Sequence, residues 1–101
     1  MSVSGLLGVN PVLMDRVRLA IMAHLAVSGG AVDFNTLIDE LGLTKGNLST
    51  HLRKLEEAQL IIVSKDFVGR KPRSTYRHSA KGKQEMNSYL NAVESLLKSV
   101  Q

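Results

Sequence analysis

Hydrophobic spacing along the chain predicts a first helix near the N-terminus. The Asn-Pro pair at positions 10–11 has the form of a helix start, a capping side chain followed by proline at the first helical position. We expect this helix to run to about Val27, where the Ser-Gly-Gly sequence at 28–30 ends it. Residues 19–27 are apolar on nearly every side of that helix. Such a helix is covered from more than one direction, and in a small domain a second subunit is a natural cover.

Two further segments with helical spacing follow. The first, 34–41, lies between a capping Asp33 and a terminating Gly42, and its apolar stripe is Phe34, Leu37, Ile38 and Leu41. The second runs from about Lys45 to Gln59 behind a capping Thr44, and its inward stripe is Leu48, His51, Leu52 and Leu55. The outward face of this helix is small and polar at its start and basic further along.

The next stretch predicts a hairpin. Residues 60–63 are a short and mostly β-branched run, which is typical of a strand. Residues 66–72 contain Gly, Pro and three charges, so we expect a loop there. Residues 73–78 can return as a second strand, with Arg73, Thr75 and Arg77 on one face. The result is a hairpin with a long basic tip.

A final helix is expected from Ala80 to about Val100, capped by Ser79. Its apolar positions are spaced as a heptad seam, which Tyr89 and Leu96 widen; the seam is Met86, Leu90, Val93, Leu97 and Val100. A seam of this kind packs either within one subunit or between two, and we expect it between two.

Charge is unevenly distributed along the chain, whose net charge is +4. Residues 1–43 carry two basic and four acidic side chains, whereas residues 44–83 carry ten basic and three acidic ones. Residues 84–101 carry one basic and two acidic side chains. The positive charge is therefore confined to the middle of the chain. This distribution suits a polyanion held against one face or, alternatively, a solvated basic surface with no partner.

The composition excludes several classes of protein. The chain has no cysteine, so disulfides, thiolate metal sites and cysteine catalysis are impossible. The longest apolar stretch, 19–27, is too short to span a bilayer, and no secretory signal is visible, so we expect a cytoplasmic protein with no membrane partner. No spacing of Ser, His and Asp suggests a catalytic set, and no phosphate-binding loop or zinc motif is present. We expect neither an enzyme nor a cofactor.

The order of the predicted elements defines a fold. A short helix, a three-residue turn containing glycine and a polar-faced helix make a helix-turn-helix, whose second helix fits the major groove of B-DNA. The basic hairpin that follows is a wing. We therefore expect a single domain over residues 1–101 that is mainly α with a small β-hairpin wing (α+β), a winged helix-turn-helix.

Residues 34–58 resemble the winged-helix regulators of the MarR/ArsR kind, and especially their short stand-alone members. In that family a run of the form LT-x-x-x-LS-x-HL-x-x-LE opens the recognition helix, and residues 43–56 reproduce it. Residues 73–77 resemble the family's second wing strand, and residues 79–82 resemble the start of its last helix. Gln59, where many members have glycine, is a departure that does not affect the fold assignment.

The resemblance implies a homodimer that regulates transcription through double-stranded DNA. By position, the recognition helix at about 45–59 would meet the major groove through Lys45, Asn47, Ser49, Thr50 and Arg53. The wing at about 65–73 would meet the backbone or minor groove through Arg70, Lys71 and Arg73, with Lys54, Lys65 and Arg77 as further phosphate contacts. The terminal helices, about 11–27 and 80–100, would form the dimer interface through Leu19, Met22, Met86, Tyr89, Leu90, Val93, Leu97 and Val100.

Other interpretations remain open. His51 lies on an apolar stripe and is interpreted as a core histidine with a hydrogen-bond partner, and Lys54 can pair with Glu56 or Glu57 instead of a phosphate. His24, His51 and His78 lie on separate predicted elements, so a metal-responsive sensor would lack a local ligand pair. A small-molecule effector is unknown, and it would need a pocket at the dimer interface. The remaining alternative is a winged-helix module that binds proteins.

Overall fold

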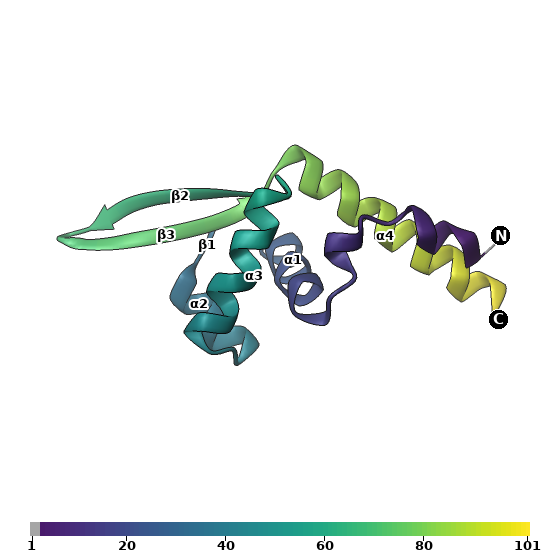
Figure 1. The fold of residues 1–101 in the computed structure, drawn as a ribbon, viewed down its shortest axis with the longest axis horizontal. Coiled ribbons are helices and arrows are strands. Elements are labelled where there is room, and N and C mark those ends of the chain that lie inside the picture. Colours follow the sequence, from purple (N-terminus) through teal and green to yellow (C-terminus); the bar gives the residue numbers. More distant parts are fainter. Residues whose placement is uncertain (1–2) are drawn as a thin grey trace.

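The computed structural model describes residues 3–101. In chain order its elements are η1 (Val3–Gly8), η2 (Pro11–Leu13), α1 (Arg16–Ser28), β1 (Val32–Asp33), α2 (Phe34–Leu41), α3 (Lys45–Glu57), β2 (Ile61–Val68), β3 (Lys71–His78) and α4 (Ala80–Ser99). The molecule is elongated, with extents of 53 × 25 × 21 Å. Figure 1 shows α1, α2 and α3 clustered at its centre, the β2–β3 hairpin projecting at one end, and α4 running to the other, where η1 lies against it.

The apolar stripes predicted for α2 and α3 face the hydrophobic core. Each central helix contributes fully buried apolar side chains, and the strands and α4 complete the cluster; its largest members are Leu13, Ile21, Met22, Leu37, Leu48, Leu55 and Leu60. Gly42 ends α2 as predicted, and the Thr44 side chain caps α3 by accepting a hydrogen bond from the Asn47 amide at 3.1 Å. The predicted helix-turn-helix, a compact unit of α2, turn and α3, is therefore confirmed.

The predicted start of the first helix is wrong. The Asn10 side chain does cap a turn, accepting from the Val12 amide at 3.0 Å, but that turn is the short 3₁₀ helix η2. The chain then breaks at Met14, and α1 begins only after Asp15. The Asp15 carboxylate accepts hydrogen bonds from the amides of Val17 and Arg18, at 2.9 and 3.0 Å. Two capped amides make Asp15 the stronger helix start.

The predicted loop at 66–72 is also wrong, because the two strands continue through it. The sheet has the order β1-β3-β2, and β2 pairs with β3 in antiparallel register out to Val68 and Lys71. Only two residues form the turn, and Gly69 adopts a φ of 63°, which a tight hairpin of this kind requires at its first central position. Pro72 is tolerated because the outer part of β3 has a neighbour on one side only.

The end of α3 and the start of α4 meet at a close contact. α3 stops at Glu57, two residues before the predicted end, and Gln59 takes a φ of 63°, a left-handed conformation that glycine adopts more readily than other residues. The Ser79 hydroxyl donates to the Gln59 carbonyl at 2.6 Å and accepts from the Gly82 amide at 2.9 Å. Ser79 thus caps α4 as predicted and also ties it to the end of α3.

Candidate nucleic-acid interface

The outward face of α3 carries most of the residues predicted for the major groove. Leu48, Leu52 and Leu55 anchor the opposite face in the core. This leaves an exposed set on the first turns and along the helix, namely Lys45, Asn47, Thr50, Arg53 and Lys54, with Ser49 half-buried beside them. The Thr50 hydroxyl donates to the Gly46 carbonyl at 2.9 Å, so it faces a ligand mainly as an acceptor. Lys54 takes part in no ion pair of the described residues.

A groove of about 220 Å³ separates this face from the hairpin. Ser49 and Arg53 line it from α3, and Lys65, Ser74 and Tyr76 line it from the strands. In the β2–β3 register Lys65 lies opposite Ser74, which places both on the same face of the hairpin. The structure therefore brings Arg53 and Lys65 to one groove, although they are far apart in the sequence. Sequence reasoning missed Ser74, since its role depends on the strand register.

The two arginines predicted on β3 lie on the other face of the hairpin. Arg73 lies opposite Asp66 and Arg77 opposite Ile62, and side chains alternate between faces along a strand. The Arg73 guanidinium donates to both Asp66 oxygens, at 3.2 and 3.1 Å. This hydrogen bonding lowers the pKa of Asp66 below its ordinary value and raises the pKa of Arg73. The structure does not bring Arg73 and Arg77 together with α3.

A polar network connects α3 to the start of α1. The Arg18 guanidinium donates to the Val12 carbonyl at 2.7 Å and contacts His51 Nδ1 at 3.2 Å, while Asp15 lies 3.8 Å from the same nitrogen. His51 is half-buried, which confirms its interpretation as a histidine with a hydrogen-bond partner at the core. Arg18, which sequence reasoning missed, thus connects α1 to α3.

Each of the other two histidines has a partner of its own. His24 contacts the Ser28 hydroxyl at 3.3 Å, and His78 Nε2 donates to the Met22 carbonyl at 2.8 Å. Within residues 3–101 no three His, Asp or Glu side chains gather into a set that could hold a metal ion. Across the same residues no helix is long and apolar enough to cross a membrane.

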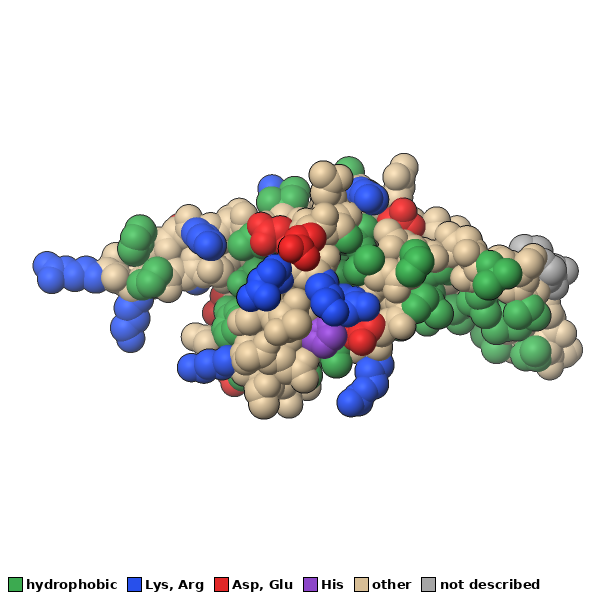
Figure 2. All heavy atoms as spheres, viewed as in Figure 1, with side chains coloured by type: hydrophobic (Ala, Val, Ile, Leu, Met, Phe, Trp, Pro, Cys, Tyr) green, Lys and Arg blue, Asp and Glu red, His purple; other side chains and the backbone are tan. Residues whose placement is uncertain are grey.

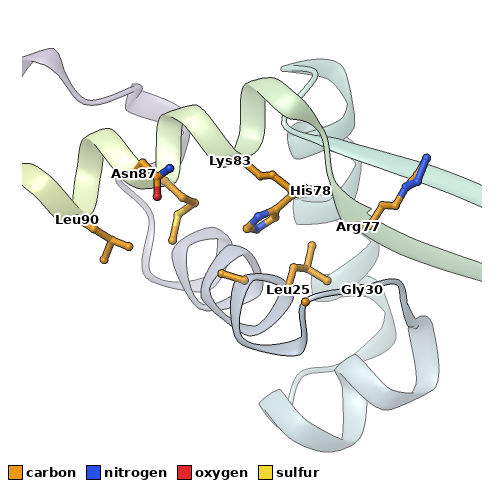
Figure 3. Close-up of a pocket in the computed structure, with 10 residues that line it drawn as sticks. Leu25, Gly30, Arg77, His78, Lys83, Asn87 and Leu90 are labelled. Atoms are coloured by element: carbon orange, nitrogen blue, oxygen red, sulfur yellow. The ribbon is translucent and has the colours of Figure 1, made fainter.

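A second groove, of about 370 Å³, lies between α1, the end of β3 and α4. Figure 3 shows the ring of His78 pointing from β3 toward α1, with Leu25 on the floor and Arg77 directed away from the groove. Leu90 borders this groove and also belongs to the apolar seam of α4.

The apolar seam of α4 is largely uncovered in the single chain. Leu90, Leu97 and Val100 are 51%, 53% and 72% exposed. Figure 2 shows apolar side chains gathered at the end of the molecule that α4 and the N-terminal segment form. Two residues predicted for the dimer interface do not belong to this surface, because Met22 and Met86 are already buried in the core of their own chain. Leu19 and Tyr89 are half-buried.

The arrangement of a helix-turn-helix, a β-hairpin beside its second helix, and a long closing helix defines the winged-helix class of DNA-binding proteins. Residues 17–97 match the family model of the winged helix DNA-binding domain, and the protein belongs to this family. The α+β winged-helix fold predicted from the sequence is therefore confirmed.

Three known proteins resemble this chain over two thirds of its length or more. A transcriptional regulator homologue from Pyrococcus horikoshii OT3 superposes with a TM-score of 0.82 at 28% identity, over 91% of this chain and 90% of its own. A MarR-like transcriptional regulator from Thermotoga maritima gives a TM-score of 0.69 at 28% identity, over 97% of this chain and 70% of its own. An uncharacterized protein of Methanocaldococcus jannaschii is 30% identical over 69 residues, which are 68% of this chain and 75% of that protein.

These findings confirm the resemblance to MarR/ArsR-like regulators. The likeness to a solved ArsR family regulator, at 19% identity, shows the fold alone. The two solved structures at 28% identity are a transcriptional regulator homologue and a MarR-like transcriptional regulator.

Proposed function

We propose that this protein is a homodimeric, sequence-specific regulator of transcription that binds double-stranded DNA in the cytoplasm. In this proposal α3 enters the major groove, and the β2–β3 hairpin lies on the backbone or in the adjacent minor groove. The observation that carries it is the groove between α3 and the hairpin, which has Arg53 on one side and Lys65 on the other. Cations on both walls of a groove beside a polar helix face suit a duplex.

The proposed contacts fall into two classes. Lys45, Asn47, Thr50 and Arg53 are exposed on α3, where the first turns of a recognition helix meet base edges. Arg70 and Lys71, at the tip of the hairpin, are exposed and take part in no ion pair of residues 3–101. They are proposed to contact phosphates, with Lys54 and Lys65 as additional contacts. Arg73 and Arg77, on the other face, contribute positive potential around the hairpin.

The proposed dimer uses the uncovered apolar surface of α4. Leu90, Val93, Leu97 and Val100 repeat along one side of the helix and are exposed in the single chain. Leu7 of η1, an element that packs beside α4, is 88% exposed and is proposed to take part in the same contact. Burial of this surface against a second copy would remove it from water, and this gain favours association. A smaller contribution comes from Val27 and Leu19 of α1.

The test is selection of bound sequences from random duplex DNA. A dimer with two recognition helices about 34–36 Å apart should select an inverted repeat with half-site centres about 10 base pairs apart, or a multiple of that. Lys98→Ala, at the far end of α4, serves as the control and should select the same repeat as the wild type. An enriched single half-site bound with full affinity would contradict the dimer. Failure to enrich any duplex at low salt would contradict DNA binding and favour a protein-binding module.

A further inference from the structure

The tip of the hairpin carries apolar side chains that the rest of residues 3–101 leave exposed. Phe67 is 71% exposed and Val68 is 56% exposed. β1 pairs with β3 only at Thr75 and Tyr76, so no strand of the described part of the chain lies beside the outer part of the hairpin as a third strand. Figure 1 shows this part projecting freely from the central helices. Folding therefore gives no reason for an aromatic residue at this position.

The register places Phe67 on the face of the hairpin that turns toward α3. Phe67 lies opposite Pro72, and the next pair toward the base on the same face is Lys65 with Ser74. Lys65 and Ser74 line the groove beside α3. Phe67 and Pro72 thus continue outward the surface that borders the recognition helix, whereas Val68 and Lys71 lie on the opposite face.

The surroundings of this apolar pair are cationic. Lys65, Arg70 and Lys71 lie within a few residues of Phe67, and the nearby carboxylate, Asp66, is engaged by Arg73. Figure 2 shows apolar side chains next to cations at the projecting end of the molecule. An apolar tip ringed by cations suits a partner that combines dense negative charge with apolar, stacked surfaces. Duplex DNA has both, in its phosphates and its base steps.

The length of the hairpin fits such a partner. Six residues separate Val63, in the groove beside α3, from Gly69 at the turn. At about 3.3 Å per residue the tip lies about 20 Å from that groove. Half a helical turn of B-DNA is about 17 Å, so a hairpin of this length spans from the major groove to the neighbouring minor groove.

We propose that Phe67, backed by Pro72, is an apolar wedge that enters the minor groove and partly unstacks one base step, while Arg70 and Lys71 hold the flanking phosphates. This inference rests on the proposed DNA binding. Apolar side chains inserted between base steps kink the duplex and favour deformable sequences. The tip would then contribute to site preference through the flexibility of the step it enters, a contribution separate from the base contacts of α3.

The experiment compares Phe67→Ala with Val68→Ala, a matched control at the same tip but on the other face. The probe is the duplex recovered by selection, labelled at both ends for energy transfer and carrying 2-aminopurine at successive flanking positions. Phe67→Ala should bind about tenfold more weakly and lose both the bend and the fluorescence rise of an unstacked base. Its salt slope should stay that of the wild type, because no phosphate contact is lost. Phe67→Leu should retain most of the bend, and Val68→Ala should match the wild type.

Several results would overturn the wedge. One is wild-type binding with no bend and no fluorescence change at any flanking position. Another is equal affinity of Phe67→Ala and Val68→Ala. A change in the mass of DNA-free Phe67→Ala by light scattering would show that the tip contacts a second copy instead. A wild-type protein that binds no duplex at low salt would contradict the proposed function itself, which distinguishes the two failures.

Discussion

Gly82, in the first turn of α4, lies against the backbone of Leu60, and this contact decides how closely α4 approaches the rest of the domain. A Cβ built on Gly82 would lie 2.0 Å from the Leu60 carbonyl oxygen, a backbone atom that cannot move without disturbing the end of α3 and the start of β2. The Ser79 amide donates to the same carbonyl at 3.1 Å. At the residue scale, this junction holds the long helix in place.

We therefore expect Gly82→Ala to lower the free energy of unfolding by about 2 kcal/mol, as overpacking in a tight site does. Gly46→Ala is the control, because Gly46 also lies in a helix but a Cβ there meets nothing within 4 Å. That change should be neutral or stabilising by up to about 1 kcal/mol. Urea unfolding of both variants measures the difference, and equal stabilities would mean that the junction is not tightly packed.

A second feature at the residue scale is Asp15, which we expect to make the free energy of unfolding depend on pH. Its pKa lies below the ordinary value of 3.8, first because the Arg18 amide donates to its carboxylate and also because the Arg18 guanidinium is nearby. A folded-state pKa below the unfolded value means that this carboxylate adds stability above the unfolded pKa and loses it as pH falls through the folded pKa. The contribution is therefore complete at neutral pH and declines in acid.

Asp15→Ala should cost about 1 kcal/mol at pH 7, the usual effect of removing a helix cap. The difference from the wild type should shrink as pH falls below about 4, the ordinary pKa of an aspartate in an unfolded chain, because the unfolded state then binds a proton that the folded state does not. Asp15→Asn keeps the capping oxygen but does not titrate, and its own difference from Asp15→Ala should stay constant with pH. Unfolding curves at several pH values test this. A gap between Asp15→Ala and the wild type that is unchanged at pH 3 would disprove the role of the charge.

At the scale of elements, α3 and the hairpin carry different kinds of contact. Arg53 lies on α3 among small polar neighbours, where a guanidinium can bind guanine through two hydrogen bonds. Arg70 lies at the hairpin turn, where we propose a phosphate contact. Phosphate contacts carry little sequence information but release counterions. Replacing each arginine should therefore weaken DNA binding in a different way, one depending on the DNA sequence and the other on the salt concentration.

Arg53→Ala should weaken binding to the selected duplex by about 1–3 kcal/mol while affecting random duplex much less. Arg70→Ala should weaken both duplexes similarly and lower the salt slope by about one. Binding of both variants to both duplexes across a salt series provides the measurement. Equal losses on the two duplexes for Arg53→Ala would make Arg53 a phosphate contact and not a base-reading residue.

At the scale of the whole molecule, the two ends have opposite chemistry. The cationic hairpin forms one end and the uncovered apolar side of α4 forms the other, with the central helices between them (Figures 1 and 2). Association through the α4 ends would leave both hairpins at the outside of a dimer, free to reach DNA. The separation of the two surfaces also means that one can be changed without altering the other.

Leu90→Asp should convert the proposed dimer to a folded monomer. Leu90 is 51% exposed in the single chain, so a carboxylate there stays in water in the monomer but would be buried without a partner in the dimer. Ser88→Asp, at an exposed position of the same helix outside the seam, should leave the dimer intact. Light scattering gives the mass and circular dichroism gives the helix content. A wild-type monomer at micromolar concentration would remove the basis of the dimer.

Local patterns in the sequence determined most of the helices of this protein. The stripe and terminating glycine of α2, the Thr44 cap of α3 and the Ser79 cap of α4 are all interactions within a few residues, so they can be predicted without knowing the fold. The same holds for the outward position of Arg53, which follows from helical periodicity once Leu48, Leu52 and Leu55 are assigned to the core.

Only the tertiary structure decided what depends on register and on packing between distant segments. The pairing of β2 with β3 continues into residues 66–72, which composition predicts to be a loop, because pairing with the opposite strand overrides local preference. That register puts Lys65 and Ser74 beside α3 and turns Arg73 away toward Asp66. Packing of α1 against the core buries Met22, which the family resemblance had placed at the dimer interface. These outcomes follow from contacts between residues far apart in the chain, which periodicity and capping signals do not encode.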